Sequence, residues 1–187
     1  MRSEPLIVEG VSLPDVTSHS TSSATNLVMR APAGELFAVY FGYTACPDLC
    51  PATLAAWKSA INRLKDADRE RLSFVFITVD PERDTAEVLN DYVGSFVDRY
   101  RVVRTTDLSK LQSAMASFLA AANIRMVNGR TEVEHTTVTY IVDSSGRVVI
   151  EWPFGTTADG MENDLKIALA NTSDETTTRG ENNEANT

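Results

Sequence analysis

The sequence predicts an α/β fold in which a central mixed β-sheet is flanked by helices. Short apolar runs rich in Val, Phe and Ile alternate with longer segments whose apolar residues recur every three or four positions. The first pattern is typical of buried strands and the second of amphipathic helices. A turn signal between two apolar runs late in the chain adds an antiparallel hairpin to this alternation.

The first half of the pattern predicts a βαβ unit followed by a further helix. Residues 36–43 and 72–79 are apolar and aromatic, and we expect them to form buried strands. The helix between them is expected at residues 51–64, with a proline in its first turn, where proline is tolerated. The Asp-Thr-Ala-Glu run at residues 84–87 predicts a capping box that begins the next helix.

The second half predicts a helix, a hairpin and a closing helix. The helix is expected at residues 108–122 and the closing helix at 157–170. Strands at 137–142 and 147–152 flank the Asp-Ser-Ser-Gly turn at 143–146. With a parallel first strand pair and an antiparallel second pair, this order predicts a thioredoxin-like arrangement.

Three regions are expected along the 187 residues. Residues 1–35 form an N-terminal extension that is partly loop, and residues 36–170 form the folded domain. Residues 171–187 contain one apolar residue and are rich in Thr, Asn and Glu. Such a segment cannot offset the entropy cost of ordering, so we expect a disordered acidic tail.

Composition excludes several classes of protein. The net charge of −9 argues against a nucleic-acid partner, which would require a basic face. Two cysteines are too few for a disulfide-rich scaffold. The longest purely apolar run, residues 36–41, is far shorter than the roughly 20 residues of a spanning helix, and we expect a soluble chain without a signal peptide.

Both cysteines lie in one short loop, Cys46-Pro-Asp-Leu-Cys50-Pro. Because Cys50 precedes a proline, we expect it just before the helix, where the helix dipole would lower the pKa of its thiol. A helical turn would bring the two side chains within about 5–6 Å, close enough for a disulfide or for one metal ion. Two buried structural cysteines, or a stapling disulfide, are the alternative, which the shared loop disfavours.

Thiolates are soft ligands that suit Cu(I) or Zn(II). His135 precedes the strand at 137–142, whose start should lie at the sheet edge where the first strand ends. It would then approach Cys46 and Cys50 as the third ligand of a copper site, the alternative being a surface histidine. We interpret His19 as a loop residue, and Asp80 as a turn residue rather than one that tunes the site.

Three segments of the chain resemble the Sco/SenC family: residues 40–51, residues 77–85 and the stretch 135–146. The resemblance extends over about residues 36–170. It implies a thioredoxin-like domain that binds one copper ion, as Cu(I) and also as Cu(II), through Cys46, Cys50 and His135. It also implies delivery of that ion to the binuclear copper site of cytochrome c oxidase subunit II.

The resemblance further implies an extracytoplasmic location, in the periplasm or at the outer face of the cytoplasmic membrane. Relatives usually carry an N-terminal membrane anchor, and we expect none within this sequence. An upstream copper donor protein is a further expected partner.

A thiol-disulfide oxidoreductase is the alternative function, with Cys46 and Cys50 as a redox-active catalytic pair that reduces cysteines of the oxidase subunit. Thioredoxins, however, use a two-residue spacer and a proline that this chain lacks near Thr136. A peroxiredoxin-like peroxidase is disfavoured, because a second cysteine four residues after the first is unusual there.

Overall fold

A six-stranded mixed sheet forms the centre of the molecule, with strand order β1-β10-β9-β4-β5-β6. The computed structural model describes residues 5–18, 25–127 and 130–184, and of residues 123–135 and 173–184 only the backbone. The strands of this sheet are β1 (Leu6–Ile7), β4 (Leu36–Gly42), β5 (Leu72–Thr78), β6 (Tyr100–Val103), β9 (Val138–Val142) and β10 (Arg147–Pro153). The predicted α/β fold with a central mixed sheet is thereby confirmed.

The pairing of the strands is thioredoxin-like, as predicted. β4 runs parallel to β5, and β5 parallel to β6, whereas β9 is antiparallel to both β4 and β10. Gly42 lies beside Thr78, and Tyr40 lies opposite Thr139. The ends of β4 and β5 and the start of β9 therefore share one edge of the sheet.

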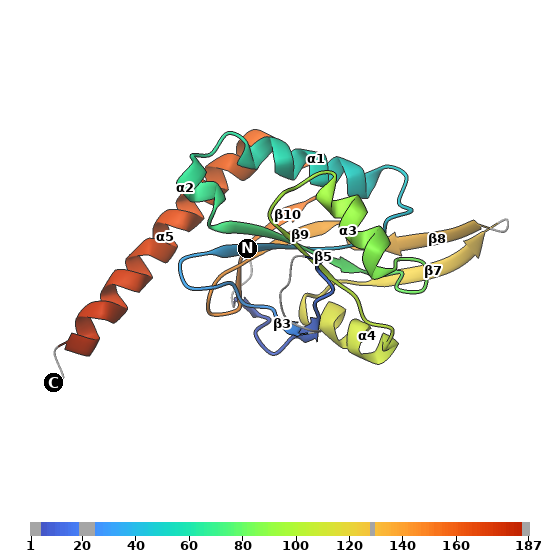
Figure 1. The fold of residues 1–187 in the computed structure, drawn as a ribbon, viewed down its shortest axis with the longest axis horizontal. Coiled ribbons are helices and arrows are strands. Elements are labelled where there is room, and N and C mark those ends of the chain that lie inside the picture. The colour runs from blue at the N-terminus through green and yellow to red at the C-terminus, as the bar shows by residue number, and fades with distance from the viewer. Residues whose placement is uncertain (1–4, 19–24, 128–129, 185–187) are drawn as a thin grey trace.

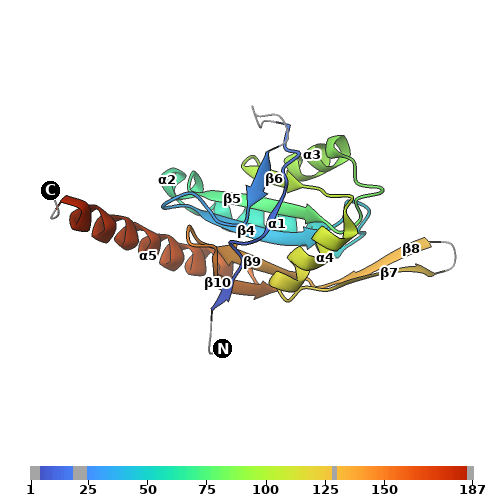
Figure 2. The ribbon, with the colours of Figure 1, turned by 90° about the horizontal axis from the view of Figure 1, so that it is seen from below.

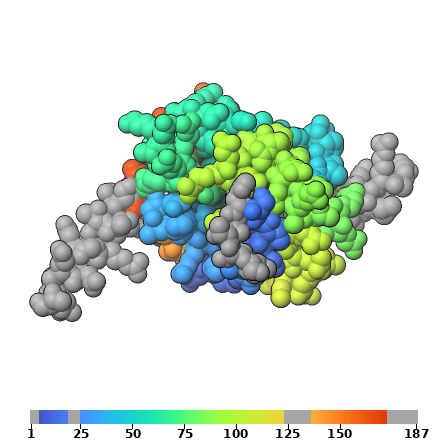
Figure 3. Space-filling view, viewed as in Figure 1, coloured from blue at the N-terminus to red at the C-terminus, as the bar shows by residue number. Residues whose placement is uncertain are grey.

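Helices cover both faces of the sheet (Figure 1). One face carries α1 (Leu49–Ile61), α3 (Ala86–Gly94) and the first part of α5 (Ala158–Glu184), while α2 (Asp66–Arg69) is a short helix after α1. The other face carries α4 (Leu108–Ser117) and the small hairpin of β2 (Ser12–Pro14) and β3 (Asn26–Val28), as Figure 2 shows from below. In the space-filling view the blue N-terminal segment lies against the yellow-green surface of α4 (Figure 3).

Alternating aromatic side chains fill the two interfaces between sheet and helices. On the α1 side, the ring of Phe74 lies 5.5 Å from that of Trp57. On the α4 side, the ring of Phe118 packs edge-on against Phe41, at 5.3 Å, and Tyr140, at 5.1 Å. Successive residues of a strand point to opposite faces, so the aromatic run of β4 serves both layers.

A hairpin replaces the end of the helix predicted at 108–122. α4 ends at Ser117, because Leu119 adopts φ +53° and the N–H of Ala120 donates to the carbonyl of Met115. This left-handed cap ends the helix in the way a glycine commonly does. The chain continues as β7 (Ala122–Val127) and β8 (Arg130–His135), which project from the body (Figures 1 and 2). No strand was predicted within residues 123–135, where β7 and β8 pair as a hairpin.

The last helix, α5, continues to Glu184, well beyond the predicted end at residue 170. Arg71 donates to the carbonyl of Leu169 at 3.0 Å and to Oγ1 of Thr172 at 2.7 Å. Thr172 is buried. Thr172, which lies inside the segment expected to be disordered, is therefore held by a side chain distant in sequence. Within the described ranges, no helix has both the length and the apolar composition needed to span a membrane.

Candidate functional site

The cysteine loop begins where aromatic rings close over the end of β4. A Cβ atom at Gly42 would lie 2.8 Å from ring atoms of Tyr40 and Phe76, which is closer than side chains normally approach. Glycine is therefore needed at this position for the two rings to pack against the backbone. The loop leaves the sheet at this point and leads into α1.

The two cysteines meet at the first turn of α1. This helix begins at Leu49, so Cys50 lies inside it. The proline after Cys50 had predicted a position just before the helix, and that prediction is wrong. Both cysteines are reduced, and the backbone N–H of Cys50 donates to Sγ of Cys46 at 3.3 Å. The N-cap residue Asp48 makes no side-chain capping bond. The sulfur that meets the N-terminus of the helix is therefore that of Cys46, whereas the sequence had assigned this position to Cys50.

Burial decides the ionisation of Cys50. Cys50 is fully buried, while Cys46 is 8% exposed. Burial raises the pKa of the Cys50 thiol to about 12, although a hydrogen bond from the backbone of Tyr43 partly offsets this effect. The prediction that the helix start lowers the pKa of Cys50 is wrong for the metal-free protein, because desolvation of the thiolate outweighs the helix dipole.

Two tyrosines contact the two sulfurs. The hydroxyl of Tyr40 donates to Sγ of Cys50 at 3.7 Å, and the side chain of Tyr43 is hydrogen-bonded to Cys46. Burial and the neighbouring Cys46 raise the pKa of Tyr43 to about 12, and burial together with Cys50 raises the pKa of Tyr40. Both phenols therefore keep their protons at neutral pH, and both can donate hydrogen bonds to sulfur. Sequence reasoning missed both roles, since a Tyr beside a strand end carries no spacing signal.

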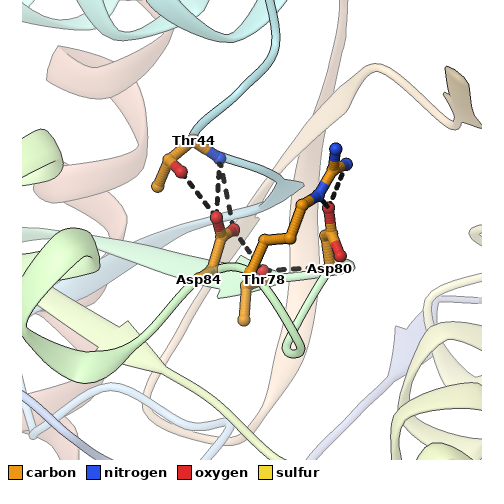
Figure 4. Close-up of polar contacts among 5 residues, drawn as sticks. Thr44, Thr78, Asp80 and Asp84 are labelled. Carbon is orange, nitrogen blue, oxygen red and sulfur yellow. Dashed lines mark hydrogen bonds and ion pairs between the residues drawn. The ribbon is translucent and has the colours of Figure 1, made fainter. Parts of the chain in front are cut away.

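A buried carboxylate ties the cysteine loop to the neighbouring strand. Asp84 accepts hydrogen bonds from the backbone N–H and the hydroxyl of Thr44 and from the hydroxyl of Thr78 (Figure 4). The predicted capping box is thus wrong about Asp84: the N-cap of α3 is Thr85, which accepts from the N–H of Val88. Asp84 points instead toward the loop that carries the cysteines.

Asp80 begins a turn, as predicted. Its carbonyl accepts from the N–H of Asp84 at 3.0 Å, and its own N–H donates to Oγ1 of Thr78. Its buried carboxylate forms an ion pair with Arg83, drawn in Figure 4. This carboxylate is already held by a cation three residues later, which suits a structural role in the turn.

The backbone of His135 reaches the same edge of the sheet. His135 is the last residue of β8 and pairs with Ala122, and the N–H of Thr136 donates to the carbonyl of Ala121 at 2.8 Å. β9 begins three residues after His135, at the edge where β4 and β5 end. The predicted position of the start of β9 at this edge is confirmed, while the approach of His135 to Cys46 and Cys50 stays a prediction.

The side chain of His135 and all of His19 lie outside the described residues. Among the side chains that the structure does describe, no three His, Cys, Asp or Glu residues gather in a metal-binding arrangement. The described part of the site is therefore the Cys46–Cys50 pair, its two tyrosines and the hydrogen bonds of Asp84.

Comparisons with known proteins agree with this geometry. The sequence model of the SCO1/SenC family matches residues 19–170. An SCO2-like protein of Rickettsia prowazekii is 32% identical over 116 residues, which cover 61% of this chain and 56% of the relative. A mitochondrial SCO2 homolog of Danio rerio is 33% identical over 138 residues, or 72% of this chain and 47% of the relative. The chain thus matches about half the length of these two relatives.

A solved structure extends the comparison to the fold. The structure of Bradyrhizobium japonicum ScoI with copper bound is 26% identical to this chain, with a TM-score of 0.69. The similarity covers 87% of this chain and 96% of the Bradyrhizobium chain. Because the family model matches most of the sequence and the fold agrees with a solved member, this chain belongs to the SCO1/SenC family.

Proposed function

We propose that the chain binds one copper ion through Cys46, Cys50 and His135 and delivers it to the binuclear copper site of cytochrome c oxidase subunit II. The observation that carries this proposal is the pair of reduced cysteines at the sheet edge to which the backbone of His135 also comes. The copper held by the Bradyrhizobium relative and the family motifs around both cysteines support it.

The donors of the pair suit a soft metal ion. Two sulfurs and one imidazole nitrogen are ligands that Cu(I) prefers, and the same set also accepts Cu(II). The metal takes the place of the thiol protons, which relieves the cost of burying a bare thiolate at Cys50. The N–H of Cys50 and the hydroxyls of Tyr40 and Tyr43 remain as donors toward the sulfurs. These groups would stabilise the negative charge of the metal-bound thiolates.

The greater exposure of Cys46 suits a site that releases its metal from one side. Cys46 is slightly exposed, Cys50 is fully buried, and Leu49 between them is exposed. An incoming ligand from the recipient protein therefore reaches the Cys46 side first. Transfer proceeds by exchange of one ligand at a time, and copper reaches this chain in the same way from an upstream donor protein. We place this exchange outside the cytoplasm.

A second candidate function is thiol-disulfide exchange with the oxidase subunit. The hydrogen bond between the side chains of Cys46 and Cys50 favours it, since the two thiols lie side by side. The two thiols would be oxidised to one disulfide while a disulfide of the partner is reduced to two thiols. The disulfide form lacks the thiolates that Cu(I) requires, so one molecule cannot hold the disulfide and Cu(I) at the same time, and the two functions would be coupled.

The first test is a Cu(I) titration of the fully reduced protein against a competing chelator. The variants are His135→Ala, Cys46→Ser with Cys50→Ser, and the matched control His19→Ala. We expect one equivalent to bind tightly to the wild type and to His19→Ala, more weakly to His135→Ala, and not to the double serine variant. Retention by the double serine variant would contradict the ligand assignment. No binding by the wild type would leave thiol-disulfide exchange as the function of the pair.

A further inference from the structure

Asp84 is a buried carboxylate that no cation neutralises within the described part of the chain. Its side chain is 1% exposed, and no ion pair of a described Lys or Arg includes it. Its carboxylate accepts instead from Oγ1 of Thr44 at 2.5 Å and from Oγ1 of Thr78 at 2.6 Å. Distances of this size between oxygens are typical of a hydroxyl that donates to an ionised carboxylate.

The guanidinium of Arg104 binds the backbone of the turn and not the carboxylate. Arg104 donates to the carbonyl of Asp84 at 2.8 Å, and its Nη2 donates to the carbonyl of Pro81, also at 2.8 Å. Arg104, which directly follows β6, therefore holds the backbone of the turn that carries Asp84. The carboxylate of Asp84 is held by hydroxyl and N–H donors, and Thr44 supplies two of these.

Thr44 lies two residues before Cys46 in the loop. Its backbone N–H is 3.2 and 3.3 Å from the two carboxylate oxygens of Asp84, and its hydroxyl binds the same group. After Thr44, the N–H of Cys46 donates to the carbonyl of Tyr43, and Sγ of Cys46 accepts from the N–H of Cys50. A short chain of hydrogen bonds thus runs from Asp84 to the sulfur atoms.

We propose that Asp84 is the positioning residue of the cysteine pair. Through Thr44 it holds the loop so that the sulfur of Cys46 stays over the first turn of α1, ready to share one metal ion with Cys50. This inference rests on the proposed copper site. Because a flexible loop must be ordered before both sulfurs can bind, fixing it in advance strengthens binding. Loss of an outer partner of metal ligands typically costs about 10- to 100-fold in affinity.

The chain offers a matched control at the other end of the sheet. Asp143 is also buried, accepts from the N–H and hydroxyl of Ser145 and the N–H of Arg147, and forms an ion pair with the Arg147 guanidinium at 3.2 Å. Asp143→Asn removes a buried carboxylate that accepts similar hydroxyl and N–H hydrogen bonds but, unlike Asp84 among the described residues, is also ion-paired, at the opposite end of the strands from the cysteines. Thr44→Val removes only the hydroxyl that binds Asp84, and Thr44→Ser restores that hydroxyl on a smaller side chain.

The test measures Cu(I) affinity by chelator competition for the wild type and these variants, well below the lowest melting temperature. We expect Asp84→Asn and Thr44→Val to bind at least about 10-fold more weakly, and Thr44→Ser and Asp143→Asn to stay within about twofold of the wild type. Equal affinity of Asp84→Asn and wild type, or an equal loss in Asp143→Asn, would overturn the inference. If Asp84→Asn fails to fold, the comparison of Thr44→Val with Thr44→Ser decides.

A second measurement needs no metal and separates this inference from the proposed function. Amide hydrogen exchange of Thr44 in the metal-free protein should be at least about 10-fold faster in Asp84→Asn and unchanged in Asp143→Asn, because only the first variant loosens this N–H. If the wild type binds no Cu(I), the proposed function fails while this readout still decides about Asp84. Unchanged exchange at Thr44 in Asp84→Asn would refute the positioning role.

Discussion

The two ends of the central strands are organised by the same chemical group in two different ways. At the end where β9 turns into β10, Asp143 accepts hydrogen bonds from Ser145 and Arg147, which lie two and four residues away. At the cysteine end, Asp84 accepts from Thr44, which lies 40 positions earlier in the sequence. The side-chain hydrogen bonds of Asp143 thus come from within its own turn, whereas those of Asp84 to the cysteine loop form only after β4, β5 and the turn before α3 have come together. The carboxylate of the turn is held by residues close to it in sequence, while that of the candidate site depends on distant segments.

The largest loss of stability that we expect follows substitution of Gly146, in the turn between β9 and β10. Besides its local hydrogen bonds, this turn packs against Glu9, which is distant in sequence. Gly146 adopts φ +74°, and a Cβ atom there would lie 2.4 Å from Cβ and 2.7 Å from Cα of Glu9. Gly146→Ala should lower the free energy of unfolding by about 3 kcal/mol, because backbone strain adds to a clash with the main chain. Chemical denaturation of the variant measures this loss.

The matched control is Gly34→Ala. Gly34 has a similar φ of +78°, but no atom lies within 4 Å of the Cβ position. Only the strain remains, and the expected cost is about 1 kcal/mol. Equal losses in the two variants would mean that the segment around Glu9 moves aside freely and that the turn end is organised locally throughout.

The contrast between the two ends also explains what the sequence could predict. The turn at 143–146 was predicted correctly, because its Asp, Ser and Gly are neighbours in sequence. The order of the strands predicted that the backbone of His135 reaches the cysteine edge. The role of Asp84 was missed, since the same residue also fits a helix cap and nothing local indicates Thr44. The ionisation of Cys50 was predicted wrongly for a similar reason: its burial is a property of the packed molecule.

A second prediction concerns acid stability at the turn end. Burial alone would raise the pKa of Asp143, but the hydrogen bonds from Ser145 and Arg147 outweigh burial and lower it. The folded state thus favours the charged form, and its stabilisation is complete above the ordinary pKa of about 3.9. It is lost as the pH falls through the lower pKa of the folded state. Asp143→Asn should be less stable than wild type by about 1–2 kcal/mol at pH 7.

The measurement is the free energy of unfolding of wild type and Asp143→Asn between pH 7 and pH 2. We expect the difference between the two proteins to shrink below about pH 4, because the wild-type carboxyl then takes up a proton. Other carboxyl groups titrate equally in both proteins and cancel in the difference. A gap that stays constant down to pH 2 would show that shape, and not charge, makes Asp143 important, and would weaken the parallel with Asp84.

The smallest expected effect is on the melting temperature when the C-terminal segment is shortened. It should distinguish Thr172, which contacts the domain, from the residues that follow it. The residues after Thr172 contain no large apolar side chain, so deletion of 173–187 should change the melting temperature by less than about 1 °C. Deletion of 171–187 also removes the Thr172 hydroxyl, which accepts from Arg71 at 2.7 Å. Loss of one such hydrogen bond costs about 1 kcal/mol, or about 2–4 °C in a chain of this size.

Thermal unfolding of the two truncations, with Thr172→Val in the full chain as control, tests this boundary. Arg71 keeps its bonds to the carbonyls of Gly34 and Leu169 in all three proteins, so only the contribution of Thr172 differs. Thr172→Val should therefore reproduce most of the loss seen on deleting 171–187. If the shorter deletion lowers the melting temperature as much as the longer one, residues after Thr172 pack on the domain. The C-terminal segment would then depend on long-range contacts, as the cysteine loop does.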